Sequence, residues 1–75
     1  MDPHTYAQAR AMQRLRDQRK RDEYSAIMVI RELIEVDGIG IDAAVNGVAT
    51  VYQLGLIQRG RIMDEAVKRY AKPIP

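Results

Sequence analysis

Arginine and lysine side chains form the densest group of chemically active residues in this sequence, between positions 10 and 21. The group consists of Arg10, Arg14, Arg16, Arg19, Lys20 and Arg21. A guanidinium is planar and can donate two parallel hydrogen bonds to a phosphate, so an arginine-rich segment suits the backbone of a nucleic acid. The six residues are therefore predicted to bind an anionic surface, with nucleic acid as the first candidate.

The distribution of charge along the chain supports this prediction. The formal net charge is only +2, but residues 1–24 hold six of the twelve cations and four of the ten acids, and the remaining residues sum to zero. All net positive charge thus lies in the first third, as expected for contact with a polyanion. The alternative is a solvated helix whose cations are neutralised within the chain. Carboxylates available for this are Asp17, Asp22, Glu32 and Glu35.

A second group of polar residues lies in segment 42–62, which can be folded as a helix, a tight turn at Gly47 and a second helix. A helix-turn-helix places its second helix in the major groove of DNA. The residues expected to face bases are Thr50, Gln53 and Gln58, and those expected on phosphates are Arg59 and Arg61. The competing interpretation is a single core helix followed by a loop.

The side chains that catalysis needs are missing or badly placed. A nucleophilic site requires a base beside its nucleophile, yet the only histidine, His4, lies near the N-terminus and the only serine, Ser25, begins an apolar segment. Glu32 and Glu35 have no histidine or third carboxylate at a spacing that would complete a metal site. We expect a non-enzymatic binding protein without a metal, a cofactor or a small-molecule substrate.

The basic residues belong to a segment, 6–24, composed of strong helix formers without glycine, proline or a β-branched residue. Its apolar arc is narrow, because only Ala7, Ala11 and Leu15 align at spacing four. Thr5 is the expected N-cap, and the residues before it are expected to be frayed. The segment is predicted to be a helix that buries little of its surface.

Three further helices are expected, at residues 25–36, 43–54 and 61–71. The first carries an isoleucine stripe at helical spacing, and the last has acid-first ion pairs at spacing four. Gly38 and Gly55 are the expected terminators of the first two, and Gly60 is expected to separate off the last. The tail from Pro73 is expected to be extended.

One alternative fold remains open. Asn46-Gly47 is a good type I′ turn pair and could form a β-hairpin, which would make the fold α+β. The arm before this pair is a poor strand former, because it contains two alanines and an aspartate. We therefore predict an all-α domain of three to four helices with a basic N-terminal helix.

The organisation expected from these elements is a basic N-terminal helical arm at residues 1–24 and a helical core at residues 25–75. The arm is expected to project from the core or to pack on a second subunit.

A domain this small buries only about 60% of the surface that its unfolded chain exposes, and without cysteine it has few aids to stability. A homodimer or an obligate partner is therefore expected.

No apolar stretch approaches the ~20 residues of a membrane span, and no secretory signal is recognisable. A cytoplasmic location without a membrane partner is therefore expected.

The predicted function is that of a small, non-enzymatic, nucleic-acid-binding regulatory protein of the size found in phages and mobile elements, such as a transcription regulator. The alternative is an adaptor or inhibitor that docks on an acidic protein surface through the basic arm and two apolar residues, Leu56 and Ile57. A structural subunit of a larger assembly is a third possibility.

Overall fold

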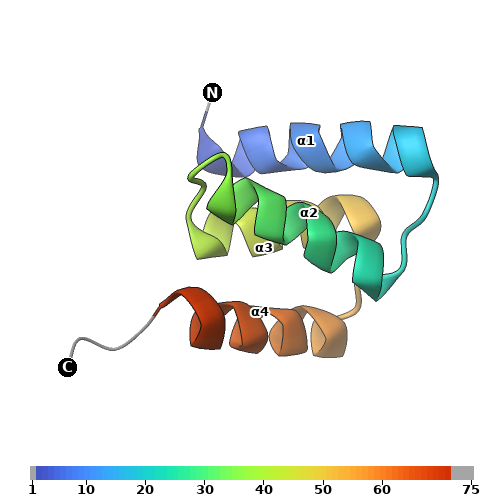
Figure 1. The fold of residues 1–75 in the computed structure, drawn as a ribbon. Coiled ribbons are helices and arrows are strands. Elements are labelled where there is room, and N and C mark those ends of the chain that lie inside the picture. The colour runs from blue at the N-terminus through green and yellow to red at the C-terminus, as the bar shows by residue number, and fades with distance from the viewer. Residues whose placement is uncertain (1, 72–75) are drawn as a thin grey trace.

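The computed structural model describes residues 2–71, which form four helices and no strand. The helices are α1 (Pro3–Gln18), α2 (Glu23–Glu35), α3 (Ile41–Tyr52) and α4 (Leu56–Tyr70). Successive helices run back and forth, so the C-terminal ends of α1 and α3 lie at the same end of the molecule as the N-terminal ends of α2 and α4 (Figure 1). The predicted all-α class is confirmed. The tail from Pro73 lies outside the described residues.

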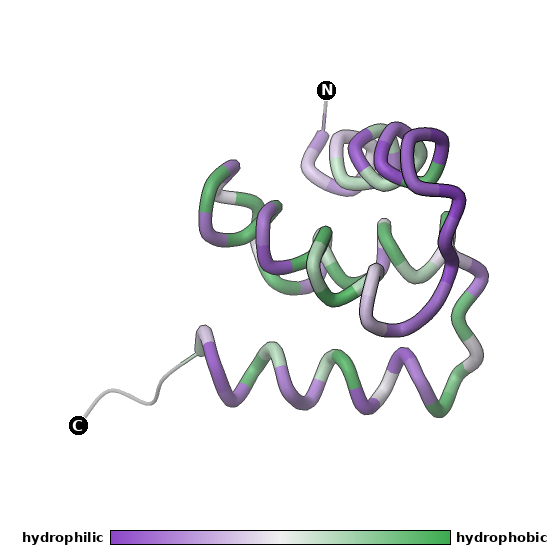
Figure 2. The backbone as a smooth tube through the Cα atoms, turned by 45° about the vertical axis from the view of Figure 1, so that its right-hand side comes forward, coloured by the Kyte–Doolittle hydropathy of each residue, from purple (hydrophilic) through white to green (hydrophobic). Residues whose placement is uncertain are grey.

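Helix α3 is the centre of the core. Its buried residues are Ala44, Val45, Gly47, Val48, Ala49 and Tyr52. Around it lie small residues of α1, a broad apolar face of α2 and two residues of α4; these are Ala7, Ala11, Ala26, Val29, Ile30, Leu33, Ile62 and Ala66. Figure 2 shows α1 nearly end-on and α4 from the side, so the axes of these two helices run in different directions across the core. The core therefore needs all four helices, including the predicted arm.

Helix α1 starts earlier and ends earlier than the sequence predicts. Its N-cap is Asp2 instead of Thr5: the Asp2 carboxylate accepts from the Thr5 backbone N–H at 2.8 Å and from the Thr5 hydroxyl at 2.9 Å. These bonds lower the pKa of Asp2. The segment around Pro3 is therefore not frayed, since proline suits the first helical position. The helix ends before Arg19, which has left-handed backbone angles, and α2 begins at Glu23.

The close approach of α1 to α3 corrects two expectations. A Cβ atom on Gly47 would lie 2.7 Å from the Ala7 Cβ and 3.2 Å from the backbone oxygen of His4. Gly47 therefore serves helix packing, and α3 continues through it, in agreement with the single helix expected at residues 43–54 and without the tight turn of the helix-turn-helix interpretation or the alternative hairpin. The basic helix does not project from the core. It packs on α3 of its own chain because glycine and alanine let the two backbones meet.

The junction between α3 and α4 also differs from the prediction. Gln53 takes left-handed backbone angles and ends α3, whereas Gly55 is the N-cap of α4 instead of the terminator of α3. The Gln58 side chain accepts a hydrogen bond from the Gly55 N–H at 3.1 Å. Helix α4 therefore begins at Leu56 and continues through Gly60, where glycine costs only about 1 kcal/mol relative to alanine.

Substitution of the two helical glycines should have opposite effects on stability. Gly47→Ala gains up to about 1 kcal/mol of helix propensity, but the added methyl overpacks the contact with Ala7, at a cost of about 1–3 kcal/mol. Gly60→Ala meets no atom within 4 Å and should gain about 1 kcal/mol. Urea unfolding followed by circular dichroism measures both. Equal stabilisation by the two substitutions would contradict the close packing of α1 on α3.

Candidate nucleic-acid interface

One end of the bundle gathers most of the predicted site residues. The linker after α1 lies against the junction of α3 and α4, because Arg21 Nη1 donates to Gln53 Oε1 at 2.9 Å. A second link joins α4 to the start of α2, where Arg61 Nε lies 3.5 Å from Glu23 Oε1. We call this region the basic end. Its cations are Arg16, Arg19, Lys20, Arg21 and Arg61.

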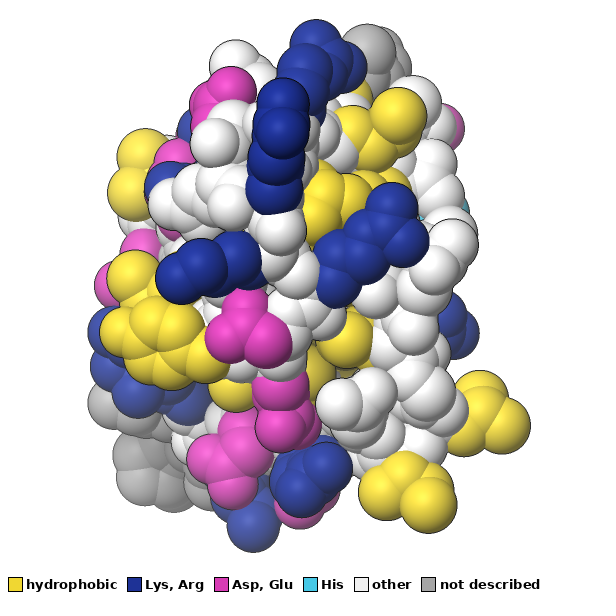
Figure 3. Space-filling model, turned by 90° about the vertical axis from the view of Figure 1, so that its right-hand side faces the viewer, with side chains coloured by type: hydrophobic (Ala, Val, Ile, Leu, Met, Phe, Trp, Pro, Cys, Tyr) yellow, Lys and Arg dark blue, Asp and Glu magenta, His cyan; other side chains and the backbone are white. Residues whose placement is uncertain are grey.

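Figure 3 views the molecule from the basic end. Lysine and arginine side chains cover the upper part of this face and recur at its bottom. Acidic side chains lie in its middle and lower part and at the upper left, and hydrophobic side chains protrude at the left and at the lower right. The face is therefore mixed, with its cations concentrated toward α1 and the linker that follows it.

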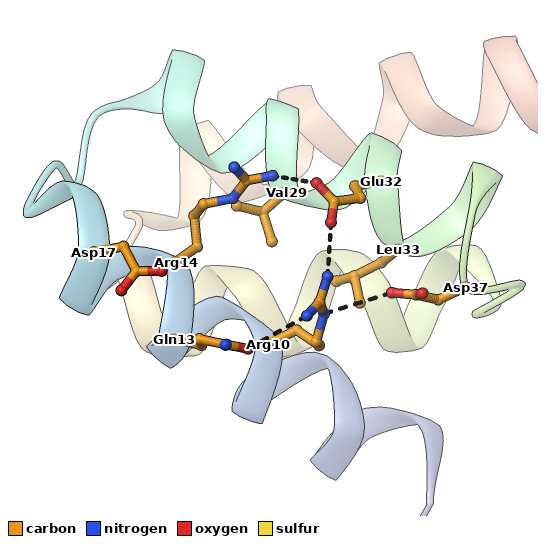
Figure 4. A pocket seen from close by; sticks show the side chains of 8 residues that line it. All are labelled: Arg10, Gln13, Arg14, Asp17, Val29, Glu32, Leu33 and Asp37. Atoms are coloured by element: carbon orange, nitrogen blue, oxygen red, sulfur yellow. Dashed lines mark hydrogen bonds and ion pairs between the residues drawn. The ribbon is translucent and has the colours of Figure 1, made fainter.

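Two of the predicted arginines are engaged elsewhere, between α1 and α2. Arg10 Nη2 lies 2.7 Å from Glu32 Oε1, and Arg10 Nε lies 3.6 Å from Asp37 Oδ2. Arg14 pairs with the other oxygen of Glu32. Figure 4 shows both guanidinium groups turned toward this one carboxylate, and Asp17 beside them without a bond to either. Neutralisation within the chain removes Arg10 and Arg14 from the candidate interface.

The arrangement around Glu32 acts as a clamp between α1 and α2. It surrounds a hollow of about 210 Å³ lined mainly by charged and polar side chains. Because the side chains of Arg10, Arg14 and Glu32 are each about one-third exposed, solvent screening limits each pair to about 1 kcal/mol or less. Sequence reasoning named Glu32 as a possible partner of the arginines but could not choose it, since the pairing spans 22 and 18 residues.

The remaining four cations of the first group have no such partner. Among residues 2–71, no carboxylate forms an ion pair with Arg16, Arg19, Lys20 or Arg21. All four residues are exposed. Arg16 lies in the last turn of α1, where the helix dipole favours a positive charge. Apart from the Arg21 Nη1 atom, which donates to Gln53, their guanidinium and ammonium groups are therefore available for an external anion.

The second predicted group is divided by the structure. The Thr50 hydroxyl donates to the Asn46 carbonyl oxygen at 2.8 Å, within α3. Gln53 is exposed in the junction, and Gln58 is half-buried in the first turn of α4. Arg59 is also half-buried, and its Nε has no hydrogen-bond partner among the described residues. The structure thus brings Gln53 and Gln58 to the basic end, together with the paired Arg61.

The other flank of α2 carries a contact that the sequence did not indicate. The Tyr70 hydroxyl of α4 donates to the Glu35 carboxylate of α2, and this hydrogen bond is the main reason that the pKa of Glu35 is lowered. Burial, followed by the same bond, raises the pKa of Tyr70. Arg31 lies 3.6 Å from Glu35. Together with the pair Arg61–Glu23, this contact joins α2 to α4 across a groove with an isoleucine floor.

No protein family, curated protein or solved structure matches this chain at a significant level. In the described part of the chain, no three potential metal-ligating side chains lie together. No described helix combines the length and the hydropathy that crossing a membrane requires.

The hydrogen bond between Tyr70 and Glu35 should make stability depend on pH. Because the folded-state pKa of Glu35 is lowered from 4.5, the contribution is complete above the unfolded-state pKa and is lost as the pH falls through the lowered value. Tyr70→Phe should reduce stability at pH 7 and have a smaller effect near pH 3. Urea midpoints at the two pH values measure this. Tyr24→Phe, at an exposed position, is the control. An equal effect of Tyr70→Phe at both pH values would contradict the assignment.

Proposed function

We propose that this protein is a small, non-enzymatic, nucleic-acid-binding protein that contacts phosphates through its basic end. One observation carries the proposal: four exposed cations at the end of α1 have no carboxylate partner among residues 2–71, whereas Arg10 and Arg14 in the same helix are neutralised by Glu32. Cations held near one another and left unpaired attract a polyanion and release its counterions.

The support for a binding role without catalysis comes from the positions of the reactive side chains. The only histidine, His4, is exposed in the first turn of α1, and the only serine, Ser25, is only 7% exposed in the core of α2. No general base stands beside a nucleophile in this arrangement. The proposed protein therefore regulates by binding to a nucleic acid and blocking access to it. We place it in the cytoplasm and among proteins of the phage or mobile-element type.

The proposed contact differs from that of a helix-turn-helix protein. Helices α3 and α4 are joined by a short turn, but the arginines of α4 are poorly placed for a recognition helix. Arg61 is paired with Glu23, and the Nε atom of Arg59 is buried. Phosphate contact by the end of α1 and its linker is better supported. A homodimer, which the small size of the chain favours, would present two basic ends to one nucleic acid.

Matched pairs of substitutions in α1 test this function. Arg16→Gln with Arg19→Gln and Arg10→Gln with Arg14→Gln remove the same charge, the first pair from the last turn and C-cap of α1 and the second from its middle. If all four unpaired cations contact phosphates, the log-log dependence of duplex DNA affinity on salt should have a slope of about −3.6. The first pair of substitutions should reduce its magnitude by about 1.8, and the second pair should leave it unchanged. Fluorescence anisotropy across a salt series measures the slopes.

The same experiment can reject the proposal. Affinity weaker than about 10⁻⁴ M at physiological salt, which is below ordinary non-specific binding, would do so. An equal loss of slope in both variants would assign the effect to net charge. Capture of one specific protein from nuclease-treated lysate, without binding to DNA or RNA, would support the adaptor alternative on an acidic partner instead.

A further inference from the structure

The two most exposed large hydrophobic side chains of the described residues are neighbours at the start of α4. Leu56 is 85% exposed and Ile57 is 83% exposed. Both lie outside the apolar face of α4, which turns Ile62 and Ala66 into the core. Leu56 and Ile57 thus form an apolar tip that the rest of residues 2–71 leaves exposed.

This tip is held on a rigid support. The N–H of Arg59 donates to the Gly55 carbonyl at 2.9 Å and begins the helical ladder, and the Gly55 N–H donates to Gln58 Oε1 at 3.1 Å. Leu54 packs against the core just before the tip, and Ile62 is buried just after it. The backbone that carries the two side chains is therefore held in place on both sides.

The carboxamides on either side of the tip have fixed orientations. Gln53 Oε1 accepts from Arg21, and Gln58 Oε1 accepts from the Gly55 N–H. Guanidinium and backbone N–H groups can only donate, so the oxygen of each carboxamide must face the protein and the NH₂ group is left for other partners. In the minor groove of DNA, A·T pairs offer only acceptors, adenine N3 and thymine O2. The donors beside the tip are chemically matched to that groove.

We propose that Leu56 and Ile57 enter the minor groove of duplex DNA as a wedge that partly separates one base step, with Gln53 and Gln58 donating to base acceptors. Aliphatic wedges of this kind kink DNA in minor-groove proteins. On its linker side the tip is bordered by positive charge, because Arg21 ties the basic linker to Gln53, and the first turn of α4 itself contains no acid. Single strands are a poorer match, since their unstacked bases pack on aromatic rings. This inference rests on the proposed function.

A mismatch preference tests the wedge separately from phosphate binding. The unchanged protein should bind a short A·T-rich duplex with one central mismatch about tenfold more tightly than the matched duplex, because separating a weakened step costs less. Leu56→Ser with Ile57→Ser should abolish this preference. The salt dependence of DNA affinity should be the same in this double variant as in the unchanged protein, because the two substitutions remove no cation. The control is Val36→Ser, which alters a side chain 75% exposed at the opposite end of the molecule.

The outcomes separate the two proposals. Absence of duplex binding by the unchanged protein overturns the wedge together with the proposed function. Equal binding of matched and mismatched duplexes by the unchanged protein overturns the wedge alone, as does a preference that survives in the Leu56/Ile57 double variant. A pull-down from nuclease-treated lysate gives a third test. If the unchanged protein and the Val36→Ser variant retain one protein that the Leu56/Ile57 double variant does not, the wedge is overturned and the tip is assigned to a protein partner. Circular dichroism verifies that both variants fold.

Discussion

The arrangement of this molecule depends on the close contact between α1 and α3. Gly47 has no side chain and Ala7 and Ala11 have the smallest ones, so the two helices meet nearly backbone to backbone. A helix whose apolar arc is too narrow to bury much surface can still join a core when its partner removes the side chain that would hold it away. This contact makes the basic segment part of the bundle and fixes the direction in which its cations point.

The position of α1 then divides its charges between two tasks. Its middle turns face α2, where Arg10 and Arg14 share the Glu32 carboxylate. Its last turn and the linker lie beyond the reach of those acids, at the end where α4 begins. The chain thus uses part of a continuous basic sequence for internal electrostatics and leaves Arg16 and Arg19 without an internal partner. The proposed function and the proposed wedge both depend on this division.

The sequence predicted helix content better than helix boundaries. The isoleucine stripe of α2 and the ion-paired half of α4 carry strong periodic signals, and both are helical in the structure. Glycine was a poor guide to helix ends. Gly55 caps α4 instead of ending α3, α4 continues through Gly60, and Gly47 lies inside α3, where it packs on Ala7, 40 residues distant in sequence. Local propensity cannot distinguish these roles from that of a glycine that ends a helix. The candidate site was predictable as a set of residue types. The sequence could not predict which arginines remain unpaired, because Glu32 reaches Arg10 and Arg14 only through the packing of α1 beside α2.

Nitrogen-15 NMR of the arginine Nε–H groups during titration with duplex DNA tests the division of charge most directly. It reports each guanidinium separately, without altering the chain. The account predicts progressive shifts for Arg16, Arg19 and Arg21, with Arg10 and Arg14 unchanged in their contact with Glu32. Shifts of Arg10 and Arg14 as large as those of Arg16 and Arg19 would show that the clamp opens to meet the nucleic acid and would contradict the account.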